Sequence, residues 1–373
     1  MSDNDEEMPV PFLDLACAFR ANEKAWLSRI REIGASGCFI LGQEVAAFER
    51  EFARYMGIKH AVAVASGTDA LVLGLRALGI GPGDEVITTP YSFFASSEAI
   101  SMVGAIPVFA DIDRNSFTID PHRITEKIGA RTRAILPVHI FGHACDMAAI
   151  LKIARAHGLV VIEDCAQAFG AKSNGEYVGA LGDCGCFSFY PTKVLGCYGD
   201  GGMLTSNDDG IQEHVRRLRN HGMVASYMHA EFGCNSRLDE IQAAALRLKL
   251  QCINDDINAR RKIAAQYARL LSGLELAIPQ SPDAESHVYG VYTIRLKNRD
   301  AVRRSLAERR ISTAVYYPLG LHLQEVYRGL GYATGSMPVC ERMTAENLSL
   351  PIYPGMPQRH IERVCNALNG AVQ

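Results

Sequence analysis

Residues 61–78 read AVAVASGTDALVLGLRAL, a short apolar run followed by a polar turn and a second apolar pattern. The run 61–65 predicts a β-strand, and Ser66-Gly67-Thr68-Asp69 then opens a helix that continues through Leu78. Backbone N–H groups at the start of such a helix, with the positive end of its dipole, form an anion site. The same four residues also suit an ordinary Thr or Asp N-cap, so this motif alone leaves both interpretations open.

The alternation of apolar runs and helical patterns continues outward from this stretch, from about Ala61 to Ser206. It predicts an α/β fold with a mostly parallel sheet. A helix is expected over about 93–103 and another over 146–156. The further strands are predicted at 85–88, 106–112, 133–139, 159–164, 185–190 and 201–206.

The pattern changes after Ser206. Two long helices are predicted at 237–250 and 254–271, followed by a strand at 288–296 and a helix at about 300–309. A chain of 373 residues exceeds what one hydrophobic core usually organises. We therefore expect a large domain with the N-terminal segment over 1–250 and a smaller C-terminal α+β domain over 251–373.

Composition argues against several classes of partner. The formal net charge is −3, which does not indicate a nucleic-acid or membrane surface. The start, MSDNDEEM, lacks the features of a signal peptide, and the segment through Met8 is expected to be a disordered tail. The eleven cysteines are odd in number and scattered, which predicts reduced thiols, a cytoplasmic location and no metal site.

Two further features stand at predicted strand ends, where ligands bind in open α/β sheets. Asp164 ends the run LVVIED, where it could meet a ligand cation or cap the next turn. Lys193 follows the strand 185–190 in a loop that contains Pro191 and then several glycines. A buried lysine there would keep some neutral amine near pH 7, whereas a surface lysine in a turn is the alternative.

Together the three features predict one ligand. It has a phosphate for the helix N-terminus, an aromatic nitrogen for the carboxylate and an aldehyde for the amine, which describes pyridoxal phosphate. The protein's task is then to bind, orient and electronically tune this cofactor. All three coinciding by chance is far less probable than each ordinary explanation taken alone.

The chain resembles the DegT/DnrJ/EryC1/StrS family of nucleotide-sugar aminotransferases, which have the aspartate-aminotransferase fold (pyridoxal-phosphate fold type I). The resemblance extends from Val10 to Val364. It rests on the motifs PFLDL (11–15), ASGTDAL (65–71), PVHIFGHACDM (137–147), VIEDCAQAFGA (161–171), SFYPTKVLGCYGDGG (188–202) and NSRLDEIQAA (235–244).

The resemblance implies a role for each matching residue. Lys193 matches the lysine that bonds to the cofactor and Asp164 the partner of its pyridine nitrogen. Gln167 matches the residue near the cofactor's phenolic oxygen, and Phe93 the aromatic residue that stacks on the ring. The phosphate cradle matches Gly67, Thr68, Asp69 and Ser188. Asn235 matches a residue that reaches the phosphate from the partner subunit, which implies a homodimer with shared active sites.

The sequence around Lys193 and the motif NSRLD most resembles that of the subgroup that aminates a 3-keto sugar. This subgroup includes enzymes acting on UDP-2-acetamido-2-deoxy-3-oxo-glucuronate. Arg237 is then a candidate for contact with the sugar acid or the diphosphate, and L-glutamate is the implied amino donor. His221, Tyr316 and Tyr317 are further candidates for the substrate mouth. Some uronate-specific relatives carry His before Tyr-Pro, where this chain has Tyr316, so a neutral sugar stays open.

Three alternatives stay beside this interpretation. They are a 4-keto-sugar aminotransferase, a same-fold sugar dehydratase that uses pyridoxamine phosphate, and a non-catalytic regulatory member of the family. Such dehydratases carry His in place of the lysine, so Lys193 argues against the second. His139, at the end of a predicted strand, is either a neighbour of the cofactor or a packing residue.

Overall fold

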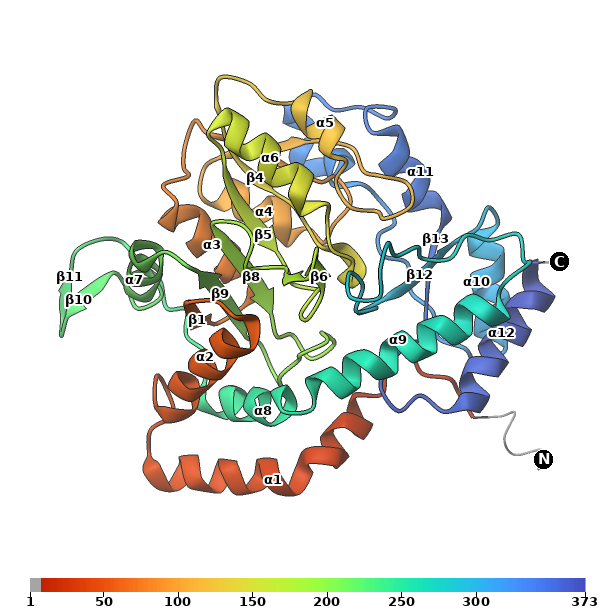
Figure 1. Ribbon diagram of the computed structural model, residues 1–373, viewed down its shortest axis with the longest axis horizontal. Helices are drawn as coiled ribbons and strands as arrows, with labels where there is room; N and C mark the ends of the chain where they lie inside the picture. Colours follow the sequence, from red (N-terminus) through yellow and green to blue (C-terminus); the bar gives the residue numbers. More distant parts are fainter. Residues whose placement is uncertain (1–7, 373) are drawn as a thin grey trace.

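The computed structural model describes residues 8–372, so the predicted disordered tail lies almost entirely outside the described residues. A seven-stranded sheet forms the centre of the molecule (Figure 1). Its strands lie in the order β1 (His60–Val64), β9 (Gly202–Ser206), β8 (Cys184–Ser188), β5 (Val160–Asp164), β4 (Thr132–Leu136), β2 (Glu85–Thr88) and β3 (Ile106–Phe109). Only β9 runs antiparallel to its neighbours, which confirms the mostly parallel sheet.

Three predicted strands are shorter in the structure by two residues or more, and the backbone explains two of these differences. The strand predicted at 133–139 ends at Leu136 in the structure, because Pro137 has no N–H to continue the hydrogen-bond ladder. The strand predicted at 288–296 covers only β12 (Tyr292–Arg295) in the structure. Tyr289 has a positive φ of 50°, which lies outside the extended region. The prediction 106–112 ends at Phe109.

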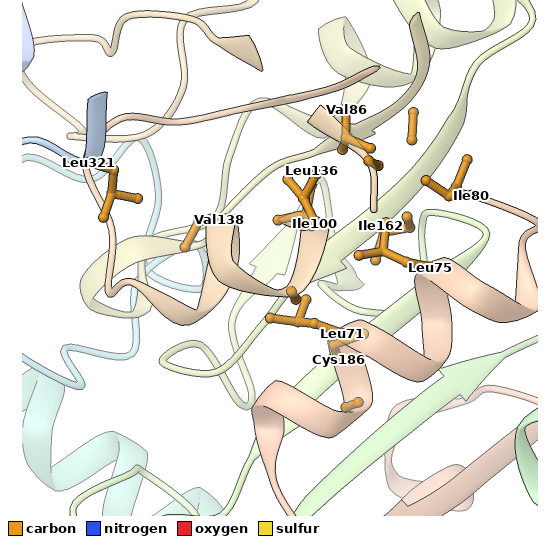
Figure 2. Close-up of a cluster of buried hydrophobic side chains, with 14 of the residues drawn as sticks. Leu71, Leu75, Ile80, Val86, Ile100, Leu136, Val138, Ile162, Cys186 and Leu321 are labelled. Atoms are coloured by element: carbon orange, nitrogen blue, oxygen red, sulfur yellow. The ribbon is translucent and has the colours of Figure 1, made fainter. Parts of the chain in front are cut away.

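The helices of the sheet region begin at polar caps. Ser66, Asp146 and Asp208 each accept a backbone N–H at the start of the helix that follows. These helices are α3 (Gly67–Ala77), α6 (Met147–His157) and α7 (Asp209–Leu218), with α4 (Ala95–Met102) and the short α5 (Pro121–Thr125) between them. Figure 2 shows Leu71 and Leu75 of α3 in one cluster with Leu136 and Ile162 from the sheet. This apolar face fixes the start of α3 against the strand ends.

Two N-terminal helices, α1 (Leu15–Ser36) and α2 (Gln43–Met56), precede the predicted elements. The start of α2 has an unusual cap, because the buried carboxylate of Glu240 accepts the N–H groups of Gly42, Glu44 and Val45 at 2.8–2.9 Å. Glu240 is the first residue of α8 (Glu240–Leu250). One side chain therefore joins two helices that are distant in sequence.

The C-terminal part has its own core. Its elements are α9 (Ile253–Leu270), β12, α10 (Arg299–Glu308), α11 (Pro338–Glu346), β13 (Asn347–Leu350) and α12 (Gln358–Val372). The first turns of α9 pack on the sheet region through Ile253 and Ile257, whereas Ile263 and Tyr267 belong to the C-terminal core. Val10 joins that core as well. The division between residues 250 and 251 stays a prediction, and α9 crosses between the two cores.

The remaining elements are short. A hairpin of β10 (Met223–Ala225) and β11 (Met228–His229) projects from the molecule at the left of Figure 1. The others are β6 (Lys172–Ser173), β7 (Glu176–Tyr177) and the 3₁₀ turns η2 (Ile140–Gly142), η3 (Leu321–Leu323) and η4 (Glu325–Leu330). Within residues 8–372, no helix combines the length and the apolar character needed to cross a membrane.

Candidate active site

The ends of β5 and β8 and the start of α3 meet at one edge of the sheet. Gly67 makes the approach close, since a Cβ added there would lie 2.7 Å from Cβ of Ser188. A Cβ at Gly202 would lie 2.3 Å from the carbonyl oxygen of Ser66. Only glycine permits both contacts. The Ser188 hydroxyl is thus held beside the N-terminus of α3.

The N-terminus of α3 has the geometry of an anion-binding cradle. The Ser66 hydroxyl accepts the N–H of Asp69 at 3.1 Å, and the Ser66 carbonyl accepts that of Ala70. The N–H groups of Gly67 and Thr68 belong to the first turn and have no intrahelical acceptor. With the Ser188 hydroxyl beside them they suit a phosphate, as the sequence predicts.

The Asp69 carboxylate has another task. Its Oδ2 accepts the hydroxyl of Ser236 at 2.6 Å, and that hydroxyl oxygen accepts the N–H of Ala65. Ser236 is fully buried, and the neighbouring Asn235 is exposed. The carboxylate thereby fixes the segment that carries Asn235 and Arg237. The N–H of Asp69 is already bonded to the Ser66 hydroxyl.

Asp164 is buried at the end of β5 with 4% of its surface exposed. Its Oδ1 accepts the N–H of Ala166 at 3.1 Å, and its Oδ2 accepts the hydroxyl of Ser96 at 2.7 Å. Both carboxylate oxygens of Asp164 are therefore held in place at the end of the strand.

Lys193 lies two residues past Pro191 in the tight loop after β8. Its N–H bonds to the carbonyl of Tyr190 at 2.9 Å, and a Cβ on Gly196 would lie 2.6 Å from the Pro191 oxygen. Burial lowers the pKa of the Lys193 ammonium, and the charge of Asp164 opposes part of that shift. A lysine with a lowered pKa offers neutral amine nearer physiological pH, which suits a nucleophile.

Gln167, Phe93 and Tyr317 complete this edge. The side-chain Oε1 of Gln167 accepts the N–H of Phe141 at 2.7 Å, and its Nε2 donates to the Tyr317 hydroxyl at 3.1 Å. The carboxamide keeps one N–H for a ligand. Phe93 is 58% exposed, and its ring centroid lies 6.4 Å from that of Tyr317. Tyr317 thus joins the proposed cofactor residues, whereas the sequence places it only in the sugar site.

His139 and Glu163 form a fully buried pair next to this edge of the sheet. Nδ1 of His139 accepts the N–H of Cys145, so Nε2 carries the proton and donates to Glu163 at 3.1 Å. Glu163 also accepts three backbone N–H groups from residues 179–182. With Cys165 these residues could offer metal ligands within 4.8 Å of one another, but the polar atoms of His139 and Glu163 are already hydrogen-bonded. His139 is therefore fully buried and hydrogen-bonded through both ring nitrogens, and its role beside the cofactor stays a prediction.

The remaining predicted substrate residues are Arg237, His221 and Tyr316, and the ring centroid of Tyr316 lies 5.7 Å from that of Tyr317. The Nη1 of Arg237 donates to Asn220 at 3.1 Å, and its buried Nε has no hydrogen-bond partner among residues 8–372. His221 is exposed at the root of the projecting hairpin, where its carbonyl lies 2.8 Å from Nδ1 of His229. Tyr316 is half-buried and accepts the Tyr91 hydroxyl through its carbonyl.

Sequence reasoning missed Ser96 and Ser236. Each hydroxyl holds a carboxylate of the site, at Asp164 and Asp69 respectively. Ser96 lies three residues after Phe93, in the stretch PYSFFASS (90–97), and Ser236 lies in the motif NSRLD. No local pattern distinguishes Ser96 from the neighbouring Ser97, so the sequence carries no signal for its role.

The donor set fits pyridoxal phosphate. An anion cradle, a buried carboxylate, an amine with a lowered pKa and an exposed aromatic ring are gathered at one sheet edge. Together with the mostly parallel sheet, they define an aminotransferase of the pyridoxal-phosphate fold type I.

The chain belongs to the DegT/DnrJ/EryC1/StrS aminotransferase family, whose model matches residues 21–369. In fold the chain resembles DesV of S. venezuelae in complex with a ketimine intermediate. The TM-score is 0.96 at 41% identity, covering 98% of this chain and 99% of that one. The family, the fold class, the cofactor and the aminotransferase activity expected from the sequence are confirmed.

Three curated relatives span nearly the whole chain. A pleiotropic regulatory protein of Geobacillus stearothermophilus is 46% identical, covering 96% of this chain and 97% of its own. The UDP-N-acetyl-3-dehydro-alpha-D-glucosamine 3-aminotransferase of Acidithiobacillus ferrooxidans is 44% identical, with coverage of 96% and 97%. The UDP-2-acetamido-2-deoxy-3-oxo-D-glucuronate aminotransferase of Pseudomonas aeruginosa is 39% identical, with coverage of 91% and 94%. The protein is a pyridoxal-phosphate-dependent sugar aminotransferase.

Proposed function

We propose that the enzyme moves an amino group from L-glutamate to a UDP-linked 3-keto N-acetylhexosamine or its uronic acid. The observation that carries the chemistry is the set of Lys193, Asp164 and Gln167 at one sheet edge. The substrate class is supported by relatives from Acidithiobacillus ferrooxidans and Pseudomonas aeruginosa, whose names specify UDP-linked 3-keto sugars.

Each residue has a separate task in this proposal. When bound, the cofactor supplies an electron sink for the electron pair released at the substrate carbon. Asp164 holds the ring nitrogen in its protonated form, Gln167 holds the phenolic oxygen and Phe93 covers the ring. Lys193 moves the proton as general acid and base, which its lowered pKa favours. The cradle at Gly67, Thr68 and Ser188 anchors the phosphate.

The next question is whether the sugar carries a carboxylate or a neutral group at C6. Arg237 can pair with a carboxylate or a diphosphate through its planar fork, and its buried Nε has no partner among the described residues. Tyr316 supplies a hydroxyl where a cationic imidazole would favour an acid. A charge-assisted contact contributes about 1.5–3 kcal/mol, so one arginine can give roughly ten- to hundredfold preference for the acid. On this ground we favour the uronic acid slightly.

The test is kcat/KM in the reverse direction with three amino sugars. The 3-amino uronate, the neutral 3-amino sugar and a 4-amino sugar are each offered with 2-oxoglutarate as acceptor. Preference for the 4-amino sugar would refute the 3-keto assignment. Equal use of the first two would refute only the role of the carboxylate.

We also propose a homodimer in which Asn235 reaches the neighbouring site. Asn235 is exposed, while buried Ser236 and Asp69 fix its backbone. In the test, Lys193→Ala and Asn235→Ala homodimers, each inactive alone, are mixed. Subunit exchange between them is verified before activity is measured. A heterodimer then holds one site with both defects and one intact site. Recovered activity is expected, and its absence would count against the shared site.

A regulatory role is the second candidate, because the relative from Geobacillus stearothermophilus bears a regulatory name. A pure binder need not keep an amine with a lowered pKa beside Asp164. Adding L-glutamate to the cofactor-loaded protein and following its absorbance separates the cases, since an aminotransferase converts the cofactor and a binder does not. The cytoplasmic location and the absence of a nucleic-acid or membrane partner stay predictions.

A further inference from the structure

Two buried serines form a chain of hydroxyl groups that ends on Asp164. The hydroxyl oxygens of Ser92 and Ser96 lie 2.8 Å apart, and that of Ser96 lies 2.7 Å from Oδ2 of Asp164. Ser92 is 4% exposed, Ser96 1% and Asp164 4%. Ser96 lies in the first turn of α4 and Asp164 at the end of β5, so the contact joins separate elements.

The direction of these hydrogen bonds follows from chemistry. An ionised carboxylate only accepts, so Ser96 must donate its single hydroxyl proton to Asp164. The Ser96 oxygen is then free to accept, and Ser92 is the donor of the pair. The chain therefore runs from Ser92 to Ser96 to Asp164. In a buried, weakly polar environment each such bond strengthens the next.

We propose that Ser96 is a positioning residue that fixes the Asp164 carboxylate for its contact with the cofactor's ring nitrogen, an inference that rests on the proposed role of Asp164. The Ala166 N–H holds Oδ1 and the Ser96 hydroxyl holds Oδ2. Each oxygen keeps a lone pair for a further donor. The two donors thus orient the carboxylate, and the remaining lone pairs could accept the ring N–H when the cofactor is bound.

The same segment also places the ring-stacking candidate. Phe93 lies between the two serines in sequence and is 58% exposed, while both serines are buried. The Phe93 carbonyl accepts the N–H of Ser96, which closes the turn. One turn thus directs an aromatic face outward and two hydroxyl groups inward, toward Asp164. The position of Phe93 is therefore linked to that of Ser96, which holds Asp164, through one backbone turn.

The test compares Ser96→Ala with Ser97→Ala. Ser97 is equally buried on the same helix, but its hydroxyl bonds to the Phe94 carbonyl and to none of the site groups. Each variant is loaded with pyridoxal phosphate labelled with ¹⁵N in the ring. In Ser96→Ala we expect the ring-nitrogen signal to move toward that of neutral pyridine. The half-reaction with glutamate should slow about ten- to hundredfold, as for a lost hydrogen bond to a charged group.

Two further variants keep the inference open to refutation. Ser96→Thr keeps the hydroxyl and should restore the nitrogen signal. Ser92→Ala removes only the outer hydroxyl and should move the signal less, in the same direction, even if Ser96→Ala fails to fold. An unmoved signal in both alanine variants, or an equal change in Ser97→Ala, would overturn the inference. Failure of the wild-type protein to convert its cofactor with glutamate would instead refute the proposed function.

Discussion

Replacing Gly67 by alanine should damage the phosphate cradle through a contact with the backbone. The new Cβ would lie 2.7 Å from Cβ, 3.2 Å from Cα and 3.3 Å from Oγ of Ser188. Rotating the serine side chain moves only its oxygen, so it cannot relieve the contacts with Cα and Cβ. The start of α3 and the end of β8 must therefore move apart.

The magnitude follows from two separate terms. Forcing an extra methyl group into a packed site costs about 1–3 kcal/mol in the free energy of unfolding. Moving the Ser188 hydroxyl away from the cradle removes one hydrogen bond to the phosphate. For a charged acceptor this loss is about 1.5–3 kcal/mol, which raises the Kd for pyridoxal phosphate roughly ten- to hundredfold.

The assay has two measurements on the apoprotein, chemical unfolding and titration with pyridoxal phosphate. Gly34→Ala is the matched control, because Gly34 lies inside α1 and a Cβ there would meet no atom within 4 Å. That variant should be stabilised by up to about 1 kcal/mol through helix propensity, with an unchanged Kd. If Gly67→Ala keeps the wild-type Kd and unfolding midpoint, the steric argument for the cradle is wrong.

Three other substitutions give distinct outcomes. Lys193→Ala should bind pyridoxal phosphate without a borohydride-reducible bond and lose transamination; reducible attachment at another lysine, such as Lys172, would contradict the assignment. Asp164→Asn should keep the fold and lose activity by several orders of magnitude, because an amide cannot hold the ring nitrogen protonated; near-wild-type turnover would remove that role. Glu240→Gln should destabilise the protein by about 1–3 kcal/mol in chemical unfolding, because one of three N–H groups at the start of α2 loses its acceptor. Asp239→Asn, which replaces an exposed carboxylate that makes no side-chain cap bond, is its control and should unfold at the wild-type midpoint.

The sequence by itself determined the local chemistry of this protein. The strand, turn and helix at 61–78, the carboxylate at the end of LVVIED and the lysine after the strand 185–190 are each legible within a few residues. The reason is that strand periodicity, helix caps and turn residues are short-range properties of a chain. Family resemblance then added Phe93 and Gln167, whose roles no periodicity indicates.

Only the tertiary structure decided which side chains meet. Ser96 reaches Asp164 across 68 residues, Tyr317 reaches Gln167 across 150, and Glu240 caps α2 from 195 or more residues away. Such contacts depend on the path of the chain, which local patterns do not encode. Helix α1 buries only Ile33 within the described monomer and so gives a weak apolar signal. The antiparallel direction of β9 is likewise set by the loop that carries Lys193, because that loop returns the chain beside β8.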